Sequence, residues 1–266
     1  MKSRASLFLA LFLLAAMPSY AAPIETPATH AFLIDKDAGT VLLNKNADER
    51  MPTSSMSKVI TLYAVFQALK EGQLKLDDEL LVSERAWKME GSKMFIKVGS
   101  KVKVEDLIRG VAIQSGNDAT IALAEGLAGS EEVFAERLNT IAKDLGMDNS
   151  HFMNASGWPA EGHYSTARDL ATLAQRIISD FPEYYHFFGE KEFTYNKIHQ
   201  PNRDPLLGKV AGADGIKTVH TDIAGYGLIG SALRDGHRLI LVINGLVDEK
   251  ARAEEGAKLM EWGFRN

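Results

Sequence analysis

Ser55 and Lys58 form a Ser-x-x-Lys pair within the segment "MPTSSMSK". A serine hydroxyl is a weak nucleophile until a base takes its proton, and a lysine whose pKa is lowered by burial or by another cation can be that base. On a helix, the spacing of three places both side chains on one face. The pair alone is weak evidence, because about one Ser-x-x-Lys is expected by chance in a chain of this length, and a solvated helical lysine is the common alternative.

Two further groups of residues could take part in the same nucleophilic chemistry. Ser115 and Asn117 flank Gly116 just before an expected helix, where both residue types are also common as plain helix caps. Lys217 and Thr218 lie in "GIKTVHTD", which by itself is also typical of an ordinary exposed strand. The elements that would position these groups therefore decide whether they form one site.

Short apolar runs at both ends of the chain predict strands. "AFLID" and "TVLLN" flank an Asp/Gly turn, which predicts an N-terminal hairpin. Near the C-terminus, residues 215–223, 226–234 and 238–246 are strand-like, and Asp235-Gly236 joins the last two. Because hairpins pair antiparallel, we expect one five-stranded antiparallel sheet made from both chain ends, and the fold class is α+β.

Helical periodicity fills the middle of the chain. A buried helix is expected from about Ser55 to Lys70, and further helices over residues 104–114, 117–129, 130–146, 166–182 and 250–264. Ser130 and Thr166 stand where N-terminal caps are expected. We expect the terminal helices to cover one face of the sheet and the middle segment to form an all-helical lobe, with the site in the cleft between them.

With these elements in place, the chain resembles the low-molecular-mass penicillin-binding proteins that act as serine-type D-alanyl-D-alanine carboxypeptidases. That group shares the set S-x-x-K, S-x-N and K-T-G with serine β-lactamases. The likeness covers essentially everything after the first 21 residues. It rests on the segments "MPTSSMSK", "GSKMFI", "LIRGVAIQSGNDA", "GWPAEGHYSTARDLA", "KEFTYN", "QPNRDPLL", "ADGIKT" with "HTDIAGYGL", and "EWGF".

The resemblance implies a role for each matching residue. Ser55 would be the acylated nucleophile and Lys58 its base, while Ser115 would relay a proton to the leaving group. Asn117 would hold the substrate amide, and the backbone N–H groups of Ser55 and His220 would form the oxyanion hole. The remaining implied residues supply positive charge and bind the terminal carboxylate of the substrate: Lys217, Thr218, Thr221 and Arg252.

The implied reaction is penicillin-sensitive removal of the last D-alanine from peptidoglycan stem peptides. It would make the protein a hydrolase of cell wall biogenesis and cell shape. It uses no metal or cofactor, and the histidines of the chain show no His-Glu-x-x-His spacing. The expected partners are stem peptides ending in D-Ala-D-Ala and β-lactam antibiotics.

One departure from the family pattern leaves other functions open. The third residue of the K-T-G motif is Val219, which should point to the same side as Lys217 and could crowd the Ser55 helix or the substrate. A weakened or non-catalytic penicillin- or peptidoglycan-binding protein is therefore an alternative. A serine β-lactamase is a lesser one, because "AERLN" places Glu136 only three residues before Asn139, short of the Glu-x-x-x-Asn spacing.

Composition sets the cellular context. Residues 1–21 combine two early cations, an apolar run and small residues before Ala22, which predicts a secretory signal peptide cleaved near Ala21/Ala22 and a periplasmic protein. Residues 22–266 are then expected to be the catalytic domain, without the family's C-terminal β domain and membrane helix, so that no membrane anchor is evident. The net charge of −5 without a basic cluster argues against nucleic acid, and the absence of cysteine excludes disulfides and thiolate chemistry.

Overall fold

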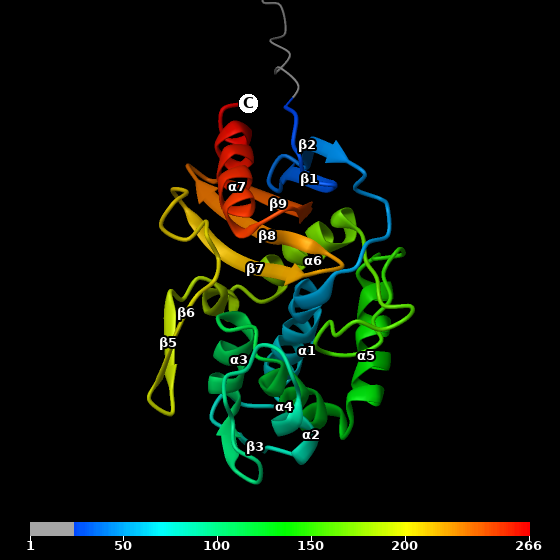
Figure 1. Cartoon of the computed structure of the whole chain (residues 1–266), viewed down its shortest axis with the longest axis vertical. Coiled ribbons are helices and arrows are strands. Elements are labelled where there is room, and N and C mark those ends of the chain that lie inside the picture. Colours follow the sequence, from blue (N-terminus) through cyan, green and yellow to red (C-terminus); the bar gives the residue numbers. More distant parts are fainter. Residues whose placement is uncertain (1–23) are drawn as a thin grey trace, which may run out of the picture.

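A five-stranded antiparallel sheet forms the upper part of the molecule in Figure 1, which confirms the predicted sheet. The computed structural model describes residues 24–266, so the predicted signal peptide lies outside the described part. Within residues 24–266 no helix is both long and apolar enough to cross a bilayer. The strand order is β2-β1-β9-β8-β7, with the bounds β1 His30–Asp35, β2 Thr40–Lys45, β7 Ala213–Thr221, β8 Gly225–Arg234 and β9 His237–Leu246.

Apolar cross-strand pairs and tight turns set the register of the sheet. β1 lies beside β9, where Leu33 pairs with Leu241. The two-residue turn between β8 and β9 has φ of 48° at Asp235 and 82° at Gly236. Positive φ at both positions suits the twist of a tight hairpin, which confirms the prediction made from this Asp-Gly pair. The register leaves β7, the strand that carries Lys217, at the edge of the sheet.

Helices cover both faces of the sheet, so the prediction that both terminal helices cover one face is wrong. The C-terminal helix α7 (Glu249–Gly263) packs on one face, where Leu259 and Met260 join the strand leucines in an apolar cluster. α6 (Ala167–Asp180) packs on the other face. The N-terminal helix α1 (Lys58–Lys70) packs against α3 to α6 instead. Its buried residues surround almost its whole circumference, which suits the middle of a helical lobe rather than a sheet surface.

The expected helical lobe contains the predicted helices and one small sheet. Ser130 Oγ accepts a hydrogen bond from Val133 N at 3.2 Å, and Thr166 Oγ1 accepts one from Asp169 N at 3.0 Å, so both caps are confirmed. The short strands β3 (Glu79–Leu81) and β4 (Lys101–Lys103) pair within this lobe, so it is not entirely helical. Its other elements are α2 (Glu84–Lys88), α3 (Val104–Ala112), α4 (Asn117–Ala128) and α5 (Glu131–Asp144).

A second small hairpin leads the chain from the lobe back to the sheet. It follows the 3-10 segment η2 (Tyr185–Phe188) and comprises β5 (Glu192–Tyr195) and β6 (Ile198–Pro201), which project from the side of the molecule (Figure 1). Gln200 at its end is buried and donates to the Met94 carbonyl at 3.3 Å. This contact fixes the start of the segment that carries Arg203 toward the sheet edge.

Candidate active site

Ser55 and Lys58 meet at a change of helix type. Ser55 lies in the 3-10 segment η1 (Ser54–Ser57), and the α-helix begins only at Lys58, later than the expected start at Ser55. Because residues i and i+3 eclipse in 3-10 geometry, Lys58 Nζ comes to 3.1 Å from Ser55 Oγ. The lysine side chain is buried, and its Nζ also donates to the Ser156 carbonyl at 2.7 Å. The pair therefore has the geometry of a nucleophile next to its base.

The charge state of Lys58 follows from its surroundings. Burial lowers its pKa well below the ordinary value for lysine, and the positive charges of Lys217 and Arg203 lower it further. Burial also lowers the pKa of Lys217 to about 7, with Arg203 and Arg252 acting in the same direction. Lys58 therefore loses its proton more readily than an ordinary lysine, as a proton acceptor requires.

Ser115 and Asn117 lie in the tight turn between α3 and α4. Ser115 has a φ of 64°, an uncommon conformation for a residue with a side chain. Among the described residues its buried Oγ has no hydrogen-bond partner. Asn117 begins α4 and donates from Nδ2 to the Glu90 carbonyl at 2.7 Å. A strained turn that presents an unpaired buried hydroxyl is typical of a functional position.

Two adjoining cavities surround Ser55. The first, of about 380 Å³, is lined by Arg203, Arg252, Ser115 and Thr218, and by Glu249, which pairs with Arg252 at 3.0 Å. The second, of about 230 Å³, is lined by both Ser55 and Lys58. Arg252 Nε is buried without a hydrogen-bond partner among residues 24–266. A buried, unpaired guanidinium nitrogen beside a second arginine suits a carboxylate ligand.

The structure brings all nine sequence-predicted residues to this place. Lys217 is buried on β7, and its positive charge lowers the pKa of Lys58. The others line one or both cavities: Ser55, Ser115, Thr218, His220 and Arg252 line the first, and Ser55, Lys58, Asn117, His220 and Thr221 line the second. Their proximity is a matter of geometry, and their individual roles remain predictions.

β7 is fixed against η1 by side-chain contacts at its end. Thr221 Oγ1 lies 3.1 Å from Ser54 Oγ, within hydrogen-bond distance. The His220 ring stacks on Tyr226 with ring centroids 3.9 Å apart. These contacts support His220, which lines both cavities together with Ser55 and to whose backbone the resemblance assigns half of the oxyanion hole.

Val219 is part of the cavity wall. Its side chain is buried, and the residue lines the first cavity together with Ser55. Its carbonyl accepts a hydrogen bond from Arg252 Nη1 at 3.4 Å. The 3.1 Å contact between Ser55 and Lys58 coexists with the valine. The valine therefore does not separate the nucleophile from its base.

Sequence reasoning assigned no role to Arg203 and Ser156. Arg203 donates to Ser92 Oγ at 2.8 Å, and its charge lowers the pKa of both buried lysines. Its segment "QPNRDPLL" is recognisable, but nothing in those letters shows that it reaches the sheet edge. Ser156 contributes a backbone carbonyl, which has no signature in sequence. The adjacent Gly157, with φ of 79°, is the only signal of a special backbone there.

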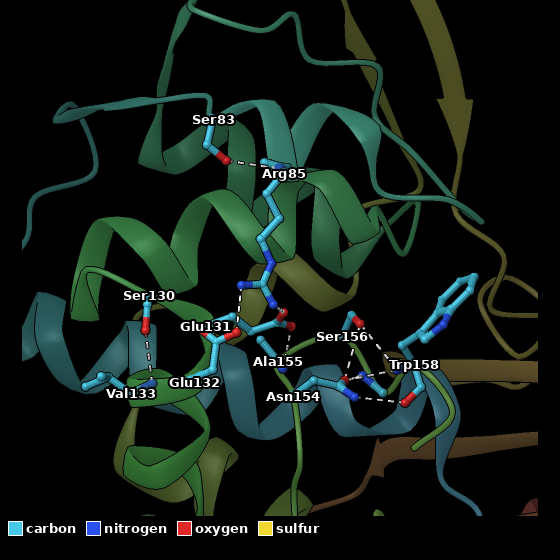
Figure 2. Close-up of polar contacts among 12 residues, drawn as sticks. Ser83, Arg85, Ser130, Glu131, Glu132, Val133, Asn154, Ala155, Ser156 and Trp158 are labelled. Atoms are coloured by element: carbon cyan, nitrogen blue, oxygen red, sulfur yellow. Dashed lines mark hydrogen bonds and ion pairs between the residues drawn. The ribbon is translucent and has the colours of Figure 1, made fainter. Parts of the chain in front are cut away.

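The loop that carries Ser156 is held by a network of polar contacts (Figure 2). Glu131 is buried and accepts from Ala155 N at 3.0 Å, while its other oxygen pairs with Arg85 at 2.7 Å. Asn154 Oδ1 accepts from the backbone N–H groups of Gly157 and Trp158, at 2.8 and 3.0 Å. The Ser156 carbonyl is therefore oriented before any ligand arrives.

Glu136 and Asn139, which fall one residue short of the Glu-x-x-x-Asn deacylation spacing, lie outside the site. Asn139 on α5 donates to the Phe152 carbonyl at 2.8 Å and accepts from Phe152 N at 2.8 Å, so it fastens the neighbouring segment. Glu136 is exposed on the same helix. Neither residue lines the two cavities around Ser55. The pair gives no support to a β-lactamase.

Taken together, the groups suit acyl transfer. Ser55 and Lys58 supply a nucleophile and a base, and the arginines supply a site for a carboxylate. Within residues 24–266 no three histidine, aspartate or glutamate side chains are grouped so that they could hold a metal ion.

Gly157 offers a test of the packing around the nucleophile. A Cβ at this position would stand 1.8 Å from the Ser54 carbonyl oxygen, whereas a Cβ at Gly129, which has the same φ of 79°, would meet nothing within 4 Å. We expect Gly129→Ala to lower the free energy of unfolding by about 1 kcal/mol through its backbone conformation alone. Gly157→Ala should lower it by about 3 kcal/mol or more, because η1 must shift. Urea unfolding measures both; equal losses would contradict the close approach.

The chain matches a protein family over most of its length. The family described as "D-alanyl-D-alanine carboxypeptidase" matches residues 17–247. D-alanyl-D-alanine carboxypeptidase DacC of Escherichia coli is 46% identical over 252 residues, which cover 91% of this chain and 63% of that protein. DacA of Haemophilus influenzae is 41% identical over 249 residues, which cover 92% of this chain and 63% of that protein. The chain thus spans less than two thirds of the length of these relatives.

Solved structures agree with the sequence matches. The D-alanyl-D-alanine carboxypeptidase DacD from Francisella tularensis superposes with a TM-score of 0.92 at 34% identity, over 95% of this chain and 74% of that one. Penicillin binding protein 5 from Haemophilus influenzae superposes with a TM-score of 0.89 at 41% identity, over 92% of this chain and 73% of that one. From the family match, the sequence identities and the shared fold, we conclude that this chain belongs to the D-alanyl-D-alanine carboxypeptidase family.

Proposed function

We propose that the protein is a serine D-alanyl-D-alanine carboxypeptidase that removes the terminal D-alanine from peptidoglycan stem peptides and is sensitive to penicillin. The observation that carries this proposal is the 3.1 Å contact between Ser55 Oγ and the buried amine of Lys58. Family membership supports it, and the two arginines in the lining of the first cavity suit a substrate that ends in a carboxylate.

In the first step, Ser55 Oγ attacks the carbonyl carbon of the penultimate D-alanine while its proton passes to the neutral amine of Lys58. The tetrahedral intermediate then collapses: the C–N bond breaks and the acyl group remains on Ser55 as an ester. The departing amine of the last D-alanine receives, through Ser115, the proton that Lys58 took from Ser55, so Lys58 is neutral again; Ser115 Oγ has no other partner among the described residues. Free D-alanine leaves.

In the second step, water hydrolyses the Ser55 ester and the shortened peptide is released. The neutral amine of Lys58 takes a proton from the attacking water and returns it to Ser55 Oγ as the C–O bond of the ester breaks. In both steps the backbone N–H groups of Ser55 and His220 would stabilise the negative oxygen, and both residues line both cavities. A β-lactam would enter as a mimic of the peptide terminus and leave a long-lived ester.

The terminal carboxylate of the substrate would lie in the first cavity beside Arg252. Thr218 lines the same cavity, and Thr221 lines the adjoining one. We add Arg203 to this group, because it lines the same cavity as Arg252. Lys217 would keep the local field positive and favour the neutral form of Lys58. The cellular setting that goes with this activity is the periplasm, after signal peptide cleavage, with a part in cell wall biogenesis and cell shape.

The direct test combines two measurements on one preparation. After incubation with penicillin, peptide mass spectrometry should locate one covalent adduct on Ser55, and an enzymatic D-alanine assay should detect release from a peptide ending in D-Ala-D-Ala. Ser55→Ala should abolish both, because it removes the nucleophile, while Ser100→Ala changes a serine outside both cavities and serves as control. No adduct and no release by the unaltered protein would refute the proposal.

The pH dependence of Ser55 acylation should be bell-shaped. The rate rises as Lys58 loses its proton, and it falls above a pH of about 7 as Lys217 does. In Lys217→Gln the like charge beside Lys58 is gone, so the pKa of Lys58 rises and the acidic limb should move to higher pH by about one unit. The alkaline limb should disappear. Lys191→Gln, at an exposed position, should leave both limbs in place; an unmoved acidic limb in Lys217→Gln would contradict the coupling.

Val219 keeps a second candidate open, a weakened or non-catalytic binding protein, because it stands where the family has glycine and lines the same cavity as Ser55. Val219→Gly should raise the rate of Ser55 acylation by penicillin several-fold. The same change should lower the free energy of unfolding by about 1.5–3 kcal/mol, since a buried side chain is lost. An unchanged acylation rate in stopped-flow measurements would show that valine does not restrict the site.

A further inference from the structure

Asp204 is a buried carboxylate to which the proposed chemistry assigns no role. It directly follows Arg203, which lines the first cavity, and the residue is only 6% exposed. Its Oδ1 accepts a hydrogen bond from Leu206 N at 2.9 Å, whereas its Oδ2 has no hydrogen-bond partner among residues 24–266. A buried carboxylate with a free oxygen is costly unless a cation lies nearby. Asp204 therefore needs a positive charge close to it.

The backbone around Asp204 is fixed by hydrogen bonds and packing. Asp204 N donates to Asn202 Oδ1 at 2.9 Å. Asn202 Nδ2 in turn donates to the Phe188 and Glu190 carbonyls at 3.1 and 2.8 Å. On the other side, Leu206 is fully buried in the apolar cluster that α7 forms with the sheet. The carboxylate of Asp204 is therefore held in the interior from both sides.

The contacts of Leu206 place this segment beside the strand that carries Lys217. A Cβ at Gly230 on β8 would stand only 2.6 Å from Leu206 Cδ1, so the leucine lies directly against that glycine. Gly230 pairs in register with Ile216 of β7, the residue before Lys217. Asp204, two residues before Leu206, therefore lies near the part of β7 that holds Lys217.

The same leucine contacts the C-terminal helix. A Cβ at Gly256 on α7 would stand 3.2 Å from Leu206 Cδ2. Gly256 follows Arg252 by about one helical turn. Burial raises the pKa of Asp204 to about 6, while the positive charges of Arg252 and Lys217 act in the opposite direction. Asp204 is therefore close enough to both cations for their charges to act on it.

Lys217 has one counter-charge within residues 24–266. The groups whose charge acts on its ammonium are Arg203, Arg252 and Asp204, and only Asp204 is negative. Lys217 Nζ makes one hydrogen bond, to the Thr218 carbonyl at 3.3 Å. Without Asp204, burial and the two arginines would all favour the neutral amine of Lys217.

The other carboxylates near these cations already have partners. Glu249 pairs with Arg252 at 3.0 Å, and Asp214 at the start of β7 pairs with Arg238 at 2.8 Å. Asp204 is the buried carboxylate that this pairing leaves free, because its Oδ2 has no hydrogen-bond partner in the described part of the chain.

We propose that Asp204 is the counter-charge of Lys217 and keeps its ammonium group protonated during acylation. Asp204 lines neither of the two cavities around Ser55, so it acts on the reaction through Lys217, as a positioning residue. Because a charged Lys217 favours the neutral form of Lys58, Asp204 helps to keep the two lysines in opposite protonation states. This inference rests on the proposed function, in which Lys58 is the base and Lys217 supplies positive charge.

The test compares Asp204→Asn with Asp235→Asn. Asparagine keeps the shape of aspartate and can still accept the hydrogen bond from Leu206 N, but it carries no charge. Asp235 is an exposed residue of the β8–β9 turn and lines neither cavity around Ser55. Asparagine also tolerates the φ of 48° at that position. Each variant thus removes one negative charge without a change of shape.

The first readout is the titration of Lys217. Protein containing lysine labelled with ¹³C at Cε is followed by NMR as pH rises, and Lys217→Met assigns the signal. The pKa of Lys217 should fall by about one unit in Asp204→Asn, because the opposite charge that favours the ammonium is lost. Asp235→Asn should leave it in place. A pKa of Lys217 that is unchanged in Asp204→Asn would overturn the proposal.

The second readout is the pH profile of Ser55 acylation by penicillin. The alkaline limb, which follows loss of the Lys217 proton, should move to lower pH by about one unit in Asp204→Asn. Asp235→Asn should keep the limb of the unaltered protein. A merely structural role of Asp204 would lower the rate at every pH and leave the limb where it is, which would overturn the proposal.

The outcomes separate this inference from the proposed function. An adduct on Ser55 that forms with an unmoved alkaline limb in Asp204→Asn would overturn the role of Asp204 and leave the carboxypeptidase standing. Absence of any adduct and of D-alanine release in the unaltered protein would overturn the proposed function. The NMR titration of Lys217 needs no turnover, so it would then still decide whether Asp204 is the counter-charge.

Discussion

The buried amine of Lys58 is the constraint on which the rest of the site depends. An ammonium group in the protein interior is costly unless it is neutralised or paired, and the described residues place no carboxylate against it. Its two contacts are the Ser55 hydroxyl and the Ser156 carbonyl, and its nearest charges are positive. Loss of the proton relieves this cost and produces the base that the proposed chemistry needs. The energetic penalty and the reactivity thus have the same origin.

Three separate parts of the fold surround Lys58. The 3-10 turn before α1 places Ser55 Oγ within hydrogen-bond distance of Lys58 Nζ. The loop held by Glu131 and Asn154 supplies the Ser156 carbonyl, which accepts a hydrogen bond from the same amine. β7 brings Lys217 from the edge of the sheet, where pairing with β8 on one side only leaves the other side open to the cleft. Because each contribution comes from a separate part of the chain, the site exists only when the sheet and the helical lobe are both formed.

Local patterns in the sequence were sufficient for most of the elements. The hairpin at Asp235-Gly236 and the caps at Ser130 and Thr166 depend on neighbouring residues, and the structure confirms them. The order of motifs indicated the family. What failed or was missed depends on long-range packing: the two covered faces of the sheet, the β5–β6 hairpin, the approach of Arg203, and the carbonyl of Ser156. These features arise from contacts between residues far apart in sequence, for which one chain carries no periodic signal.

The measurement that tests the central claim most directly is the titration of Lys58 itself. Protein containing lysine labelled with ¹³C at Cε can be followed by NMR as pH rises, and Lys58→Met assigns the resonance of interest. The account predicts one lysine signal that titrates well below the ordinary lysine pKa, as burial and the charge of Lys217 require. A Lys58 signal that titrates together with the exposed lysines would contradict it, because the residue could not then act as the base for Ser55 near neutral pH.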